Sequence, residues 1–288
     1  MDRRELRSRI AGALYGFAIG DAMGATTEFM SAEQIESELG RVTKIVGGGW
    51  LSLAPGEVTD DSQMMVCVID ALMEYPDDAE SFKAECAANF SLWLDTRPKD
   101  VGATCARGIR YWEETGEYVP EDEHARGNGA LMRYLPCALL GLDELNVEQG
   151  RITHNSPEST RAILSASKAL RHCMRGNYPG GDTSGPQTPS GEVRATLSNA
   201  MYHNRDGMTF RGTLEEAVNR GGDADTIAAI SCSLAGARVG LEGIDPRLIG
   251  PIQLEMKKKI GEFVDFAVDF LFTNERSFGK ILRRRSHA

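Results

Sequence analysis

The sequence predicts an all-α protein of 288 residues. Apolar residues recur at helical spacing along most of the chain, and between residues 79 and 94 they are three or four positions apart. Convincing alternation of apolar and polar residues is absent, and residues 42–46 could form at most one short strand. Turns rich in Gly, Pro, Asn and Asp separate the apolar segments. These observations favour one compact helical domain over residues 1–288.

About ten helices are expected. The first, residues 5–22, is rich in Ala and Gly, so a neighbouring helix can approach it closely. Ser31 introduces a short polar helix over 31–39, and a strongly apolar helix over 63–75 stops before Pro76. The remaining expected helices cover residues 79–94, 103–115, 129–140, 157–175, 191–202, 213–219, 224–241 and 255–272.

The longest connection, residues 177–190, reads NYPGGDTSGPQTPS, a composition that predicts a flexible loop. Because the helical pattern is similar on both sides, we expect this loop to lie inside one domain. The chain ends in the basic sequence LRRRSHA, residues 282–288, which we expect to be frayed.

Composition excludes several classes of function. The formal net charge of -10 argues against broad nucleic-acid binding, which uses a basic surface. The six cysteines form no CxxC pair, so we expect reduced, mostly buried thiols in a cytoplasmic protein. No run reaches the roughly 18 apolar residues that a membrane span needs. We therefore expect a cytoplasmic monomer that binds neither nucleic acid nor a membrane.

Two adjacent carboxylates, Asp60 and Asp61, follow Thr59 at the mouth of an apolar helix. Asp60 can be the N-cap of this helix, with Gln63 completing a capping box. Carboxylates are also stabilised near the positive end of a helix dipole, by roughly 0.3–1 kcal/mol each. Taken alone, this turn favours helix capping.

A second turn changes that interpretation. The sequence GGDADT, residues 221–226, again places two carboxylates and a hydroxyl before an apolar helix. An unpaired carboxylate in a semi-buried turn is costly, whereas hard divalent cations such as Mg²⁺ or Ca²⁺ take oxygen ligands. If the two turns face each other, their carboxylates and hydroxyls can hold one or two cations, and the charge sum favours two. Together the turns predict a metal site.

Other polar residues carry weaker signals. Asp21 and Glu28 flank the end of the first helix, where either can be an ordinary helix-end or surface charge. The Gly-Asn-Gly turn at 127–129 opens an expected helix and suits phosphate, although Asn-Gly is equally an everyday tight turn. His154 lies in a polar turn where it can be structural or reach a ligand. Trp50 can contact a substrate or belong to the core.

These segments resemble the ADP-ribosylglycohydrolase family, the all-helical, magnesium-dependent enzymes related to dinitrogenase reductase-activating glycohydrolase. The matching stretches span residues 12–240 and follow the family's order: GALYGFAIGDAMGATTEF, GEVTDDSQMM, RGNGALMRYLPCALL, THNSPES and NRGGDADTIAAISCSLAGARVG. The resemblance implies a compact orthogonal multi-helix domain and a bacterial-type hydrolase. It would remove ADP-ribose from a modified protein side chain, with arginine favoured, by cleaving the N-glycosidic bond at C1″ of the distal ribose.

The resemblance also implies roles for single residues. Two Mg²⁺ ions, which Mn²⁺ can replace, would be held by Thr59, Asp60, Asp61, Asp223, Asp225 and Thr226. Asp60 and Asp225 would act in catalysis through these ions, with Asp225 as the favoured bridge between them. Glu28 would lie beside the metals, and Asp100, a looser match, at the substrate; either could be the general acid or base. The ADP-ribose cleft would be lined by Gly127, Asn128, Gly129, Met132 and His154.

Some alternatives stay open. Residues 177–190 and 201–212 match no family motif, so the acceptor could be arginine, serine, a nucleic-acid base or a small ADP-ribosyl compound. A non-catalytic relative that binds ADP-ribose would keep the fold, but the complete acidic set favours an enzyme. A helical isoprenoid synthase would use a DDxxD helix, and the segment DDSQM lacks the distal Asp. Reversal of an endogenous modification and immunity against a toxin would need the same site.

Overall fold

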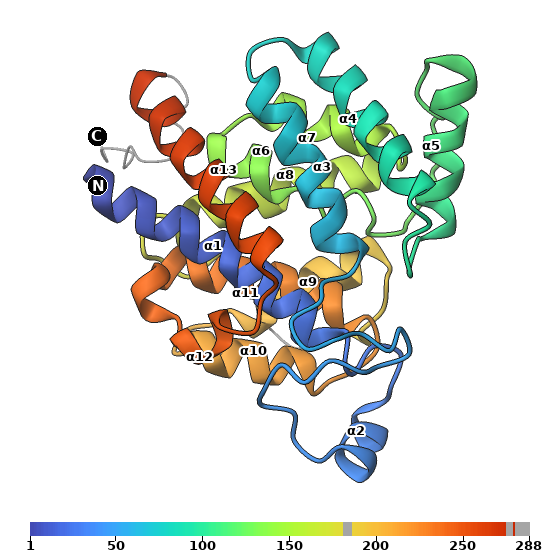
Figure 1. The fold of residues 1–288 in the computed structure, drawn as a ribbon. Helices are drawn as coiled ribbons and strands as arrows, with labels where there is room; N and C mark the ends of the chain where they lie inside the picture. The colour runs from blue at the N-terminus through green and yellow to red at the C-terminus, as the bar shows by residue number, and fades with distance from the viewer. Residues whose placement is uncertain (181–185, 275–278, 280–288) are drawn as a thin grey trace.

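The computed structural model describes residues 1–180, 186–274 and 279, and it confirms the all-α class (Figure 1). The helices of the first half are α1 (Arg3–Gly24), α2 (Ala32–Glu38), α3 (Asp60–Glu74), α4 (Ala79–Asp95), α5 (Ala103–Thr115) and α6 (Leu135–Leu140). The second half contains α7 (Asp143–Arg151), α8 (Pro157–Cys173), α9 (Val193–His203), α10 (Phe210–Val218), α11 (Ala224–Val239), the 3₁₀ helix η1 (Leu241–Gly243), α12 (Pro246–Ile249) and α13 (Leu254–Thr273). In the described ranges, β structure is limited to isolated bridges, so the short strand considered for 42–46 is wrong.

The centre of the molecule is the pair formed by α1 and α11 (Figure 1). Glycines at every fourth position of α1 bring the two backbones together. A Cβ added at Gly16 would lie 2.2 Å from the carbonyl oxygen of Cys232, and one at Gly20 would lie 2.3 Å from that of Ala228. The helices run antiparallel, so the end of α1 lies beside the start of α11. The close approach expected from the Ala- and Gly-rich sequence is confirmed.

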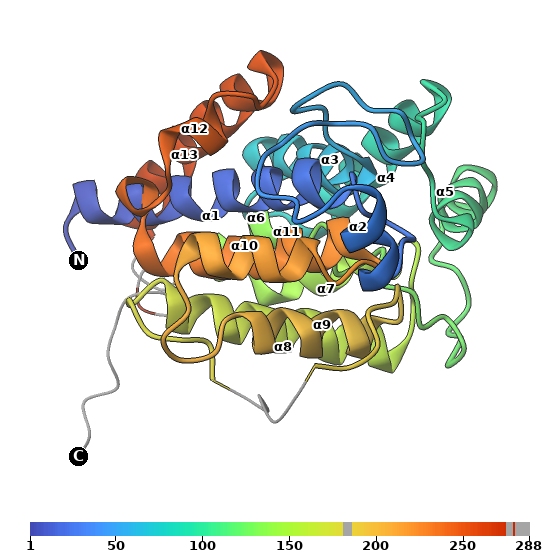
Figure 2. The same ribbon diagram turned by 90° about the horizontal axis from the view of Figure 1, so that it is seen from below.

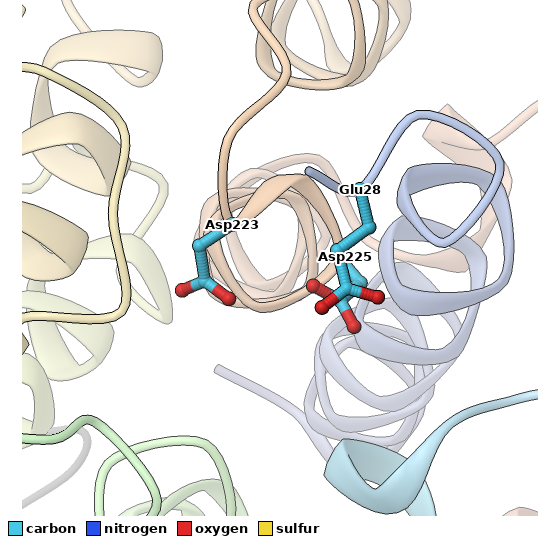
Figure 3. A group of neighbouring side chains, drawn as sticks. All are labelled: Glu28, Asp223 and Asp225. Carbon is cyan, nitrogen blue, oxygen red and sulfur yellow. The ribbon is translucent and has the colours of Figure 1, made fainter. Parts of the chain in front are cut away.

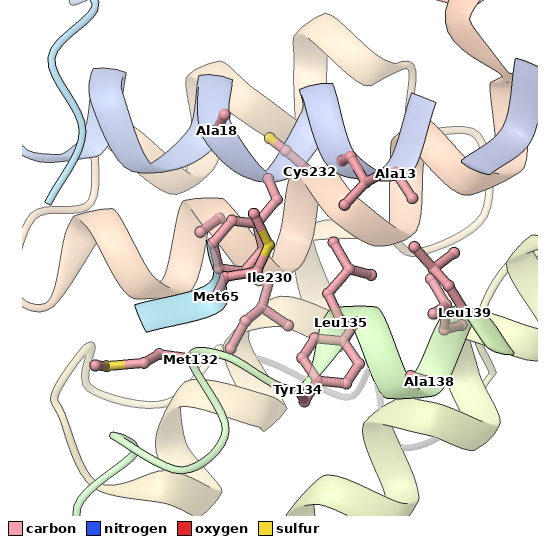
Figure 4. Packing of buried hydrophobic residues seen from close by; sticks show 14 of the residues in the cluster. Ala13, Ala18, Met65, Met132, Tyr134, Leu135, Ala138, Leu139, Ile230 and Cys232 are labelled. Carbon is pink, nitrogen blue, oxygen red and sulfur yellow. The ribbon is translucent and has the colours of Figure 1, made fainter. Parts of the chain in front are cut away.

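The other helices cover this central pair. Figure 2 shows α13 on one side of α1, and α10, α9 and α8 following on the side of α11. The helices α3, α4 and α5 form a second group, which α7 joins to α8. Figure 4 shows the core where α1 and α11 meet α6, with Leu135 and Leu139 buried against them. The organisation of residues 1–288 as a single domain stays a prediction.

The start of α3 differs from the expected capping box. Its N-cap is Thr59, whose hydroxyl accepts a hydrogen bond from the backbone N–H of Asp61 at 3.3 Å. Asp60 is already inside the helix, so its prediction as the N-cap is wrong. The Gln63 side chain donates to the carbonyl of Val58 instead of returning to the cap. By contrast, the helix that Ser31 introduces does begin with a complete capping box.

The expected helix over 129–140 is wrong in its first half, because α6 begins only at Leu135. Residues 129–133 form turns, so the Gly-Asn-Gly sequence is not a helix N-terminus. In the structure the Arg133 guanidinium donates to the carbonyl of Gly129 at 2.7 Å. In a helix this carbonyl would accept from the backbone N–H of Arg133.

All six cysteines are buried and free, as expected. The helices α7 and α12 were not predicted. Among the helices that the structure describes, none has the length and apolar character needed to cross a membrane. The basic tail at 282–288 lies outside the described residues.

Candidate active site

One cavity of about 560 Å³ collects the residues that the sequence singled out. It is bounded by the starts of α3 and α11, the segment after α1, the loop before α5 and the turn at 127–129. Of the predicted site residues, Thr59 alone does not line it. The predicted residues that line the cavity are Glu28, Asp60, Asp61, Asp100, Gly127, Asn128, Gly129, Met132, His154, Asp223, Asp225 and Thr226.

Asp21 connects the first acidic turn to α1. Its fully buried carboxylate accepts hydrogen bonds from the backbone N–H groups of Thr59 at 3.0 Å and Ser62 at 3.1 Å. The first amides of a helix have no partner within the helix, so Asp21 satisfies two donors at the start of α3. The reading of Asp21 as an ordinary helix-end charge is wrong. The residue fixes the acidic turn of α3 beside the end of α1.

The second acidic turn reaches the first through Thr226. Its Oγ1 lies 3.3 Å from Oδ1 of Asp61 and 3.3 Å from Oδ1 of Asp223. Asn128 holds Asp223 from the opposite side, because its side-chain amide donates to Oδ2 at 2.6 Å. The two turns, far apart in the sequence, therefore face each other as the predicted metal site requires.

The carboxylates fit a divalent cation. Glu28, Asp223 and Asp225 each place one oxygen within 4.8 Å of the others (Figure 3). Figure 3 shows Glu28 coming from the segment after α1 and the two aspartates from the start of α11. Among the residues that the structure describes, the buried Oδ2 of Asp61 and Oδ1 of Asp225 find no hydrogen-bond partner. Buried acceptors without partners are costly, and an all-oxygen ligand set is the one that hard divalent cations prefer.

The same crowding perturbs the acid–base properties of the site. Burial raises the pKa of Glu28 to about 8; the Trp50 hydrogen bond opposes this rise, while the charge of Asp100 adds to it. Burial also raises the pKa of Asp223 to about 6. The pKa of Asp225 lies well above its usual range, first because of burial and then because of the Glu28 charge. Without a cation, this cluster retains protons that a bound cation would displace.

His154 packs directly on the glycine turn. A Cβ added at Gly129 would lie 2.7 Å from Cε1 of His154, and one at Gly127 would lie 3.0 Å from Nε2. The imidazole is 3% exposed and lines the cavity. Burial, and then the positive charge of Arg133, lower the pKa of His154 to about 3, so the ring is neutral at ordinary pH. His154 is therefore buried and lines the cavity, and its contact with a ligand stays a prediction.

Comparison with known proteins identifies the family. The sequence profile of the family named ADP-ribosylglycohydrolase matches residues 2–201 and 166–276. The chain belongs to the ADP-ribosylglycohydrolase family. The ADP-ribosyl-(dinitrogen reductase) glycohydrolase of Rhodospirillum rubrum is 34% identical over 290 residues, which cover 90% of this chain and 95% of that protein. The ADP-ribosylarginine hydrolase Tri1 of Pseudomonas putida is 28% identical over 279 residues, 84% of this chain and 73% of that protein.

A solved structure gives the same result for the fold of this ADP-ribosylglycohydrolase. It carries the name ADP-ribosylglycohydrolase-related protein complex and superimposes with a TM-score of 0.76 at 27% identity. The alignment covers 93% of this chain and 98% of that one. The family and the enzyme class predicted from the sequence, a hydrolase of ADP-ribosyl compounds, are confirmed.

The structure also shows residues of the site that we did not assign from the sequence. The indole N–H of Trp50 donates to the Glu28 carboxylate at 2.6 Å, and the Trp50 ring lies 5.3 Å from that of Phe29. Both rings are exposed, Trp50 by 51% and Phe29 by 67%, so the core role considered for Trp50 is wrong. Phe29 itself lines the cavity. The position of Trp50 after three glycines was a signal of an exposed turn.

Proposed function

We propose that this ADP-ribosylglycohydrolase is magnesium-dependent and releases ADP-ribose from ADP-ribosylated arginine side chains of proteins. The reaction is hydrolysis of the N-glycosidic bond between C1″ of the distal ribose and a guanidine nitrogen. The observation that carries the proposal is the convergence of two acidic turns on one cavity, with buried oxygens of Asp61 and Asp225 left unpaired. The names of the Rhodospirillum rubrum and Pseudomonas putida relatives support a protein substrate and an arginine acceptor.

Two Mg²⁺ ions are proposed to bind between the two turns, where Mn²⁺ can replace them. When bound, they would orient the ribose hydroxyls and lower the pKa of a water molecule. Hydrogen bonds within the protein hold the proposed metal ligands in position, since Asp21 fixes the first turn and Asn128 orients Asp223. The proposed ligands are Thr59, Asp60, Asp61, Asp223, Asp225 and Thr226.

Glu28 and Asp100 are proposed to have different roles at the bond that is cleaved: Glu28 in proton transfer, Asp100 in contact with the acceptor. Glu28 lies among the carboxylates of the cavity, where it can take a proton from the attacking water. Its charge also stabilises the positive charge that develops on the ribose as the bond breaks. Asp100 is half-buried in the loop before α5 and lines the same cavity, which suits contact with the acceptor guanidinium.

The other end of the cavity is proposed to hold ADP-ribose. Its lining there is formed by the turn at 127–129, by Met132 and by His154. The backbone N–H of Asn128 is engaged with the carbonyl of Gly191 at 3.0 Å, which ties this turn to the start of α9. The proposed binding surface is thus held in place before the ligand arrives.

The aromatic pair beside Glu28 supports arginine as the acceptor. A guanidinium is planar and cationic, and it stacks on aromatic faces while it pairs with carboxylates. Phe29 and Trp50 offer exposed ring faces next to the Glu28 carboxylate. A serine hydroxyl has neither the charge nor the plane that this arrangement complements.

The proposal is tested by replacing one aspartate from each turn. Asp60→Ala and Asp225→Ala should each lower the Mg²⁺-dependent release of ADP-ribose from arginine-modified protein by roughly 100-fold or more. Asp206→Ala, which removes an exposed carboxylate outside the cavity, is the matched control and should retain full activity. EDTA should abolish turnover by the unaltered enzyme. Undiminished turnover in both cavity variants, or faster hydrolysis of serine-linked than of arginine-linked ADP-ribose, would contradict the assignment.

A further inference from the structure

A fully buried arginine lies under the proposed ADP-ribose surface. The Arg133 guanidinium is 0% exposed and stacks over the ring of Phe90 at 4.5 Å. It donates to the side chain and backbone oxygens of Gln149, at 2.7 and 2.9 Å, and to the carbonyl of Gly129 at 2.7 Å. Its Nη2 also donates to Oγ1 of Thr153 at 2.7 Å. One guanidinium therefore holds both the glycine turn and the turn that carries His154.

The hydrogen bond to Thr153 has a chemical consequence for its neighbour. An arginine side chain has donors but no acceptor, so Oγ1 of Thr153 must accept from Arg133. The hydroxyl still has one proton to donate, and Nδ1 of His154 lies 2.9 Å from Oγ1. If the hydroxyl donates to Nδ1, that nitrogen is unprotonated, and a neutral imidazole then carries its hydrogen on Nε2.

The competing acceptor for the Thr153 proton is the thiol of Cys105. Burial raises the pKa of this thiol, so it stays protonated. A neutral sulfur is a weak acceptor, whereas an imidazole nitrogen is a good one. The imidazole is therefore favoured over the thiol as the partner of the hydroxyl.

The other ring nitrogen, Nε2, lies next to the glycine turn. A Cβ added at Gly127 would be 3.0 Å from Nε2, and both Gly127 and His154 line the cavity. Within the part of the chain that the structure describes, no protein acceptor is found for Nε2. A hydrogen on Nε2 is thus available to an oxygen of a ligand.

We propose that Arg133, acting through Thr153, fixes His154 in the Nε2–H tautomer, so that His154 is a neutral hydrogen-bond donor to bound ADP-ribose. The identity of the ligand rests on the proposed function, whereas the tautomer rests on the protein alone. Arg133 and Thr153 are positioning residues, since neither needs to touch the ligand. His154 then orients ADP-ribose and does not act as an acid or a base.

The tautomer is measured by nitrogen NMR of protein labelled in its histidine rings. The His154 signals are identified by their loss in His154→Gln, and the spectrum is expected to show Nδ1 unprotonated and Nε2 protonated from pH 5 to pH 8. Thr153→Val removes the hydroxyl and should shift the population towards Nδ1–H. Thr153→Ser keeps the hydroxyl and should restore the original spectrum. An Nδ1–H tautomer in the unaltered protein, or no change in Thr153→Val, would overturn the relay.

Binding of ADP-ribose in the presence of Mg²⁺ is measured by calorimetry on the same proteins. Thr153→Val is expected to bind roughly three- to tenfold more weakly, the size of one hydrogen bond, and Thr153→Ser within about twofold of the unaltered protein. Thr115→Val, which changes an exposed threonine at the end of α5, is the matched control and should leave tautomer and affinity unchanged. The expected tautomer without any ADP-ribose binding would overturn the donor role and the proposed function together, and would leave the relay intact.

Discussion

Trp50 and Glu28 form a hydrogen bond at the edge of the candidate active site. The indole N–H donates to a buried carboxylate, and the exposed indole face lies beside Phe29. The Trp50 hydrogen bond lowers the pKa of Glu28. We propose that the exposed indole face also contacts the acceptor, so that one side chain has two separable tasks.

Two substitutions at Trp50 separate these tasks. Trp50→Phe keeps a ring but removes the donor that lowers the pKa of Glu28, so the pH profile of kcat should shift upward. Trp50→Ala also removes the ring, and it should raise KM for arginine-modified protein by roughly two- to tenfold, as expected for a lost cation–π contact. Affinity for free ADP-ribose should change little in either variant.

Steady-state kinetics between pH 5 and pH 9 checks this prediction. Leu92→Ala, which removes an exposed apolar side chain of α4 away from the cavity, is the control for loss of surface area. An unchanged pH profile in Trp50→Phe and an unchanged KM in Trp50→Ala would show that the indole serves neither task.

For single residues, the sequence predicts a site role where the evidence lies in neighbouring positions of the chain. The pairs Asp60–Asp61 and Asp223–Asp225 stand out because like charges adjoin at the start of an apolar helix. Asp21 gives no such signal, because its role depends on backbone amides of a segment that only the fold brings close. The same holds for the contacts of Asn128 with Asp223 and of Trp50 with Glu28, because the partners are distant in sequence.

At the scale of elements, the regular spacing of glycines in α1 produces its close contact with α11. Its glycines recur every four residues, which places them on one face of the helix. That face meets backbone carbonyls of α11, so the space is too small for any side chain. The contact aligns the end of α1 with the start of α11, and the carboxylates on those two segments share one cavity as a result.

Gly16→Ala tests this contact. The added Cβ would lie 2.2 Å from the Cys232 carbonyl oxygen, so the helices must separate. Overpacking of this kind costs about 1–3 kcal/mol, and Tm should fall by roughly 2–4 °C for each kcal/mol in a protein of this size. Gly261→Ala in α13 is the matched control, since nothing lies within 4 Å of the added atom. There the alanine should be neutral or stabilising, because it favours helix. Equal melting temperatures for both variants would contradict the close packing.

Helix α7 is an element that the hydrophobic pattern of the sequence does not predict. Its buried side chains include Asn146 and Gln149, whose amides bond to Tyr134, Ala130 and other core groups. A helix that buries polar residues has no apolar spacing, so hydrophobic periodicity cannot detect it. The reverse occurs after Gly129, where apolar residues are contiguous but the segment forms turns, with the Gly129 carbonyl accepting from the Arg133 guanidinium.

At the scale of the whole molecule, we expect the acidic cavity to make the stability of the fold depend on pH and on the proposed metal. A carboxyl group whose pKa is raised on folding binds more protons in the folded state than in the unfolded state. Its contribution to stability is present below the unfolded pKa and is lost as the pH rises through the folded pKa. For Glu28 and Asp223 the folded values are about 8 and about 6. The metal-free protein should therefore lose stability between pH 5 and pH 8.

Thermal unfolding at pH 5, 6, 7 and 8 checks this expectation. With EDTA, Tm should fall across this range. With Mg²⁺, Tm should rise, because a ligand of the folded state stabilises it, and the rise should be larger at pH 8 than at pH 5. The difference between the two curves at each pH isolates the cavity from the other charges of the protein. Parallel curves would contradict the coupling.

The pairing of α1 with α11 also has a consequence for synthesis of the chain, because it joins an early segment to a late one. A ribosome completes α1 (Arg3–Gly24) long before it reaches α11 (Ala224–Val239). At a synthesis rate of about 5–20 residues per second, α11 is completed roughly 10–40 s after α1, and the glycine face of α1 has no α11 to pack against during this time. A nascent chain that ends before the second acidic turn lacks Asp223, Asp225 and Thr226, so its candidate site is incomplete. We therefore expect truncated chains that lack this turn to release no ADP-ribose.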